Sequence, residues 1–71
     1  MGELSLEQIA GVKLKSIIKA NYKTQQDFAD DYGMEIRTVN RYVNNGITKL
    51  ATIEELADFF HVDYKFFLSL D

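Results

Sequence analysis

Two groups of carboxylates lie close enough together in the sequence to suggest acid–base chemistry. The first group is Asp27, Asp30 and Asp31, and the second is Glu54 and Glu55. All five fall on predicted helix faces, with no nucleophile and no pocket-forming segment beside them, so solvated helix surfaces explain them better than general acid–base catalysis. The chain also has no Cys, a single His and no glycine-rich phosphate loop, whereas a metal site needs several such ligands. We therefore expect no enzymatic activity, no metal and no cofactor.

The cations, in contrast, are concentrated in the middle of the chain. The net charge is −3 over 71 residues, but residues 13–49 hold seven Lys and Arg against four Asp and Glu, which gives +3. Residues 50–71 hold one Lys against five Asp and Glu, which gives −4. The acidic total argues against a non-specific polyanion binder. The molecule is nevertheless polarised, with a basic middle and an acidic end.

The composition indicates one folded domain, which we place over residues 1–71. Hydrophobic residues make up 46% of the chain and charged residues 27%, and Pro is absent, which is typical of a globular, helical protein. No apolar run approaches the roughly 20 residues of a membrane span, and the N-terminus lacks the pattern of a signal peptide. We therefore expect a cytoplasmic protein without membrane association.

Apolar residues at helical spacing predict five short helices. The first should run from about residue 6 to residue 20, with Ser5 and Gln8 forming a capping box at its start and Gly11 marking a point where it could break. The second should begin at Thr24 and end at Gly33, because glycine readily adopts the left-handed conformation that ends helices.

The last three helices follow from similar signals. The third should span about residues 36–44 and stop near Asn45. A second capping box, from Thr52 to Glu55, should open the fourth helix. Asp63 should cap a fifth helix that contains Phe67 and Leu70.

Residues 25–44 have the spacing of two helices that cross steeply. A small residue, Ala29, fits the contact point, and Gly33 supplies the positive φ of a tight turn without a Cβ clash. Val39 is a branched anchor that would face the core. Other positions expected to be buried are Phe28, Tyr32, Met34 and Tyr42. A helical hairpin that binds nothing would explain the same spacing.

This unit resembles the helix-turn-helix of the lambda-repressor-like family, which includes the phage repressor, Cro and xenobiotic-response-type regulators. Residues 56–63 resemble that family's passage from the fourth to the fifth helix, so the resemblance covers about residues 12–70. It implies an all-α, compact five-helix lambda-repressor-like domain. Helices two and three would form the helix-turn-helix, and the third would lie in the major groove of DNA.

The resemblance also implies which residues would contact double-stranded DNA. The base-reading face would consist of Ile36, Arg37, Asn40 and Arg41. Arg37 would bind guanine O6 and N7 together, and Ile36 would touch a thymine methyl group. The backbone would be contacted by Lys23, Gln25, Thr38, Asn44, Asn45 and Lys49. Solvated charge is the alternative explanation for the two arginines, with Glu35 or Asp31 as ion-pair partners.

Glu35 departs from the Ser or Thr that the family often has at the start of the third helix. A carboxylate suits the positive end of a helix dipole but is repelled by phosphate. It should therefore accept a hydrogen bond from a cytosine N4 amine or pair with a neighbouring arginine.

The resemblance implies a sequence-specific DNA-binding transcriptional regulator, a small bacterial or phage repressor that binds a palindromic operator as a homodimer. Phe67 and Leu70 could pack across the two-fold axis, or the whole terminal segment could fold inward. A protein-interaction module on the same scaffold is the alternative, with the acidic residues 50–71 facing a basic partner. The two functions differ in whether the basic side chains converge beside the third helix. A third possibility is that the chain is the DNA-reading part of a longer regulator.

Overall fold

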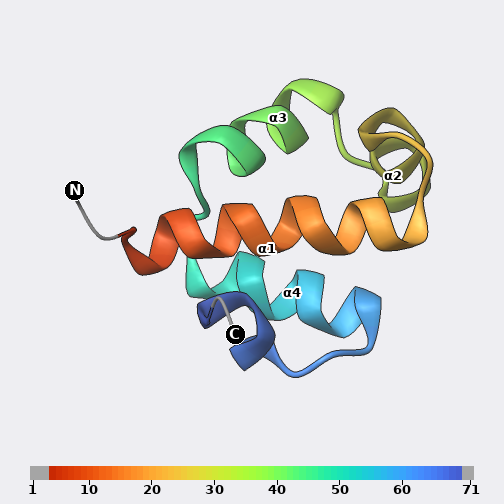
Figure 1. Ribbon diagram of the computed structural model, residues 1–71. Coiled ribbons are helices and arrows are strands. Elements are labelled where there is room, and N and C mark those ends of the chain that lie inside the picture. Colours follow the sequence, from red (N-terminus) through yellow and green to blue (C-terminus); the bar gives the residue numbers. More distant parts are fainter. Residues whose placement is uncertain (1–3, 70–71) are drawn as a thin grey trace.

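The computed structural model describes residues 4–69, which form four α-helices and one 3-10 helix and contain no strand. The elements are α1 (Leu6–Asn21), α2 (Gln25–Tyr32), α3 (Ile36–Asn45), α4 (Leu50–Phe60) and η1 (Tyr64–Leu68). In Figure 1, α3 lies along one side of α1 and runs in the opposite direction, while α4 and η1 lie on the other side. Helix α1 is therefore the central element, and the all-α prediction is confirmed.

The first helix begins as the sequence predicts. The backbone N–H of Gln8 donates to the Ser5 hydroxyl over 3.2 Å, and the Ser5 N–H donates to the Gln8 side-chain oxygen over 3.0 Å. The break considered at Gly11 is wrong, because α1 continues through it. A Cβ at Gly11 would lie 2.4 Å from the backbone oxygen of Tyr42, so this glycine instead lets α3 approach α1 closely.

The connection from α2 to α3 also agrees with the prediction. The Thr24 hydroxyl accepts a hydrogen bond from the N–H of Asp27 over 3.0 Å at the start of α2. Gly33 ends that helix with φ 86° and ψ 31°, which is the left-handed conformation that favours glycine. Ala29 and Val39 are fully buried, so the small residue and the branched anchor lie where the spacing places them.

Two predictions about the second half of the chain are wrong. Helix α4 begins at Leu50 rather than after Thr52, because the carbonyl of Lys49 already accepts from the N–H groups of Thr52 and Ile53. Thr52 is therefore the third residue of the helix and not its cap. The expected fifth α-helix is a 3-10 helix of five residues, a length too short for a stable α-helical nucleus. Asp63 does cap it, accepting from the N–H of Lys65 over 2.9 Å.

The core is built around a cluster of aromatic rings at the far end of α1. Phe28 is fully buried; its ring stacks on those of Tyr32 and Phe60 and meets Tyr22 and Phe59 edge to face. These contacts join α2 to α4 and to the end of α1. The remaining positions that were expected to be buried, Tyr32, Met34 and Tyr42, are half-buried and pack against the core.

The proposed dimer contact of Phe67 is wrong. Its side chain is fully buried within one copy of the chain, because η1 packs against both α1 and α4 and turns this ring into the core. A second copy cannot reach it without unfolding that packing. Leu70, the other residue named for the two-fold contact, lies outside the described residues.

His61 ends α4 in the left-handed conformation, with φ 61° and ψ 41°, and is the one residue other than glycine with positive φ among residues 4–69. A residue with a Cβ in this conformation strains the folded state by roughly 1–2 kcal/mol, and glycine removes that strain. Glycine also increases the entropy of the unfolded chain, which offsets part of the gain in stability. We expect His61→Gly to raise the free energy of unfolding by about 0.5–1 kcal/mol. Thermal denaturation should show a melting temperature higher by a few degrees. A matching rise in His61→Ala would contradict this explanation, because alanine keeps the Cβ.

Candidate functional site

Helix α3 presents a polar face to solvent on the side opposite its core anchor. Val39 is fully buried, whereas Arg37, Asn40 and Arg41 are exposed. Asn44 is exposed as well and lies three residues beyond Arg41, which places it on the same side of the helix. The structure therefore brings together three of the four predicted base-reading residues and one predicted backbone contact.

Ile36 lies at the margin of this face. It is half-buried and packs against the core, so only part of its side chain is free to contact a ligand. Glu35, immediately before it, is exposed and caps α3 without a side-chain hydrogen bond. Among residues 4–69 neither Arg37 nor Arg41 forms an ion pair, and the Asp31 carboxylate accepts instead from the Tyr22 hydroxyl over 2.6 Å.

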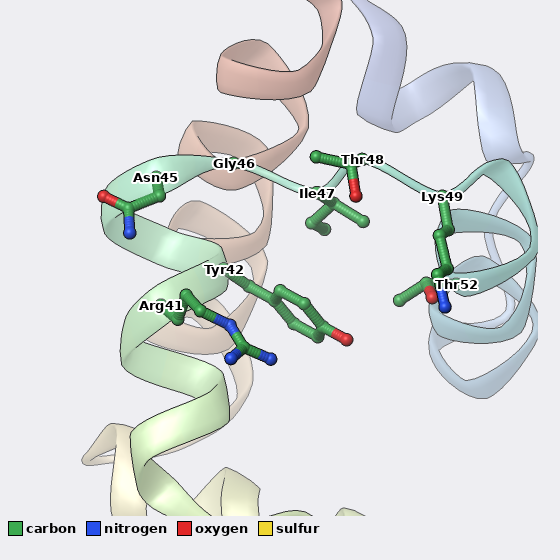
Figure 2. A pocket seen from close by; sticks show the side chains of 8 residues that line it. All are labelled: Arg41, Tyr42, Asn45, Gly46, Ile47, Thr48, Lys49 and Thr52. Carbon is green, nitrogen blue, oxygen red and sulfur yellow. The ribbon is translucent and has the colours of Figure 1, made fainter.

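A hollow of about 370 Å³ lies between the end of α3 and the start of α4. Figure 2 shows Arg41 and Tyr42 on the α3 side of it, Lys49 and Thr52 on the α4 side, and the loop of Gly46, Ile47 and Thr48 between them. The Arg41 guanidinium lies 5.9 Å from the centre of the Tyr42 ring, which favours a cation–π contact. Asn45 completes the lining.

The loop that forms this hollow is fixed to the start of α1. The N–H of Ile47 donates to the carbonyl of Glu7 over 3.0 Å, and the Ile47 side chain is buried. Gly46 approaches the same turn so closely that a Cβ would lie 2.6 Å from the Glu7 oxygen. Arg41 and Lys49 are therefore held on two sides of one rigid loop.

Three of the polar side chains that line this hollow were not predicted as site residues: Tyr42, Thr48 and Thr52. Tyr42 was assigned to the core and Thr52 to a helix cap, and no local pattern distinguishes Thr48 from any other loop hydroxyl. Their shared position depends on how the loop folds back onto α1. Sequence spacing alone could not reveal it.

A second hollow, of about 200 Å³, lies between the end of α1 and the start of α2. Its lining residues are Lys15, Ile18, Lys19, Tyr22, Lys23, Thr24 and Gln25. Two predicted backbone contacts, Lys23 and Gln25, therefore lie together, but they are separate from the first hollow. The hydrogen bond to Asp31 raises the pKa of the Tyr22 hydroxyl above its usual value, with burial as the second cause, so this hydroxyl remains a donor near neutral pH.

The remaining predicted backbone contact, Thr38, is half-buried on α3. The spacing from Thr38 to Asn45 is seven residues, which places both on one side of the helix. That side borders the first hollow, which Asn45 lines.

Among residues 4–69, no helix is long and apolar enough to cross a membrane. No group of His, Cys, Asp or Glu side chains in that part of the chain is arranged to hold a metal ion.

Comparison with protein families gives one match. A helix-turn-helix family model fits residues 14–67 of the 71-residue chain, from the middle of α1 to the buried Phe67. Comparisons with curated proteins and with solved structures found no match.

Proposed function

Because this chain belongs to the helix-turn-helix family of lambda-repressor-like and Cro proteins, which are DNA-binding transcription regulators, we propose that it is a repressor that binds a palindromic operator. Helices α2 and α3 would be its helix-turn-helix, with α3 in the major groove and α2 across the backbone. Residues 1–71 would act as one DNA-binding domain.

The observation that carries this proposal is the convergence of Arg41 and Lys49 on the hollow at the end of α3. A cation on the exposed helix face and a cation at the start of the next helix, with hydroxyl groups between them, suit a phosphate group that lies beside bases read by the same helix. The alternative, an interaction module that uses the acidic residues 50–71, does not account for cations gathered beside α3.

Within this proposal the predicted residues take two roles. Arg37, Asn40 and Arg41 would read base edges, since all three are exposed on the face of α3 opposite the core, and the exposed part of Ile36 would touch a thymine methyl group. Backbone contacts would come from Lys23, Gln25, Thr38, Asn44, Asn45 and Lys49. Phosphate contacts would supply most of the affinity, and base contacts most of the discrimination.

A palindromic operator requires two copies of the chain. Two α3 helices must then enter successive major grooves, about 34 Å apart. We therefore retain a homodimer on DNA as part of the proposal, with a contact that does not involve Phe67.

The test of this function is selection of bound sequences from a random duplex pool at near-physiological salt. We expect an enriched inverted repeat whose affinity falls several-fold as the salt concentration rises, because binding releases the counterions of the phosphates. A pool that stays random even at low salt would contradict the proposal and favour the interaction module.

Arg37→Ala should weaken binding to the enriched duplex by about 1–3 kcal/mol and relax the preference at one base pair. The guanidinium group is exposed and unpaired among residues 4–69, so its removal should leave the fold intact. Fluorescence anisotropy with duplexes changed at one base pair at a time measures both effects. Lys65→Ala, which removes an exposed cation from η1, serves as the control. An unchanged preference at every base pair would refute the role of Arg37.

A further inference from the structure

Two lysines of the second hollow have no role in the function proposed above. Lys15 and Lys19 lie four residues apart on α1, which places them on the same side of that helix with a rise of about 6 Å between them. Both are exposed, and both line the hollow together with Lys23. One surface therefore carries three positive charges.

These three charges have no neutralising partner in the part of the chain that the structure describes. Lys15, Lys19 and Lys23 form no ion pair among residues 4–69. The Asp31 carboxylate accepts from the hydroxyl of Tyr22 in the wall of the hollow and forms no ion pair with these lysines. Like charges that gather without partners repel one another, and an anionic ligand would relieve that repulsion.

Gln25 supplies an independent sign of a missing polar partner. Gln25 lines the hollow, and its side-chain oxygen is buried without a hydrogen-bond partner. Its NH₂ group makes no hydrogen bond within residues 4–69 and is a donor that suits an anionic oxygen. A phosphate in the hollow would thus meet lysine ammonium groups and an amide donor together.

The position of this hollow relative to α3 identifies the anion. The first hollow lies where the loop before α4 meets Glu7, at the start of α1, and the second lies at the other end of α1. Because α3 runs alongside α1 in the opposite direction (Figure 1), the first hollow lies at the end of α3, and the second lies at the end of α1 that is beside the start of α3. A duplex lying along α3 would offer backbone phosphates at both ends.

We propose that Lys15 and Lys19 bind phosphates of duplex DNA, so that the backbone contact made at the start of α2 continues along α1. This inference rests on the proposed DNA-binding function and adds two residues to its surface. The two lysines contact no bases. They raise affinity for any duplex equally and leave the sequence preference unchanged.

The test compares Lys15→Gln/Lys19→Gln with a control of the same net charge, Lys13→Gln/Lys65→Gln. Lys13 lies on the opposite side of α1, with its ammonium group 4.1 Å from the centre of the Phe66 ring, and Lys65 is exposed on η1. Anisotropy titrations use two probes, the duplex enriched by selection and a scrambled duplex of equal length, between about 50 and 200 mM salt. Circular dichroism establishes that both variants stay folded.

We expect the magnitude of the slope of log affinity against log salt to fall by about 1 for each lysine removed, hence by about 2 in the test variant. The loss should be equal for both probes, and the control should keep the slope of the unmodified chain. Equal slopes in the test variant and the control would overturn the inference while leaving the proposed function in place. A change in base preference in the test variant would also overturn it. If the unmodified chain binds neither probe, the proposed function fails first and the inference fails with it.

Discussion

Gly46→Ala should destabilise the protein severely. Gly46 has φ 102° and ψ 174°, a conformation that is almost restricted to glycine and costs a residue with a side chain about 1–3 kcal/mol. A Cβ there would also lie 2.6 Å from the oxygen and 2.8 Å from the carbon of the Glu7 carbonyl. Since both are backbone atoms, the loop and α1 must separate, and we expect a total loss of about 3–5 kcal/mol.

That loss is large for so small a chain. Domains are stabilised by roughly 0.05–0.15 kcal/mol per residue, which is about 4–11 kcal/mol for 71 residues, so the substitution would remove at least about a quarter of the stability. Chemical denaturation followed by far-UV circular dichroism should show a midpoint at a much lower denaturant concentration. The separation would also displace Ile47, whose N–H bonds to Glu7, and would disrupt the hollow between Arg41 and Lys49.

Gly33→Ala is the matched control for Gly46→Ala. Gly33 also has positive φ, 86°, but a Cβ there would meet no atom within 4 Å. The substitution therefore tests conformational strain without steric overlap, and we expect a loss of only about 1–2 kcal/mol. Equal losses in the two variants would show that the close approach of the loop to α1 contributes nothing to stability.

Arg37→Ala/Arg41→Ala should sharply reduce discrimination between the selected duplex and a scrambled one. Each arginine is expected to contribute about 1–3 kcal/mol. Contributions of distinct base contacts are roughly additive, so the double variant should lose about 2–6 kcal/mol, at least a thirty-fold change in affinity. Within the proposal Arg41 can contact both a base and a phosphate. It lies on the exposed face of α3, and it also lines the hollow together with Lys49.

Competition titrations with both duplexes measure this effect directly. Lys13→Gln/Lys65→Gln again removes two positive charges from elsewhere and should keep the preference. Circular dichroism should be unchanged in the arginine variant, since both side chains are exposed. If the arginine variant still prefers the selected duplex by the same factor, sequence reading does not reside on this face of α3.

Much of the first half of the fold could be predicted because its signals are local. Ser5 and Gln8 cap α1 through contacts three residues apart, and Thr24 and Gly33 delimit α2 in the same way. Ala29 and Val39 are buried as their spacing requires. Each of these features depends on one or two turns of helix, which sequence periodicity describes well.

The errors arose where long-range packing overrode a local signal. The sequence around Thr52 and Glu55 forms a good capping box, but α4 starts earlier because the preceding loop is held on α1 by Ile47. Gly11 is unfavourable within a helix by propensity alone, yet it is needed for the contact with Tyr42. Phe67 is large and apolar, as interface residues often are, but its side chain is buried in the core because η1 packs against α1 and α4.

The amino-acid sequence by itself determined that the chain is helical, where α1, α2 and α3 begin and end, and which side of α3 is polar, because caps and helical periodicity act over a few residues. Only the tertiary structure decided that Arg41 shares a hollow with Lys49, and that Lys15 and Lys19 join Lys23 at a second one. The second grouping depends on how the chain turns from α1 into α2, and the first depends on the close approach of α3 and the following loop to α1. The contacts of Gly11 and Gly46 set that approach, and they join residues more than thirty positions apart in the chain.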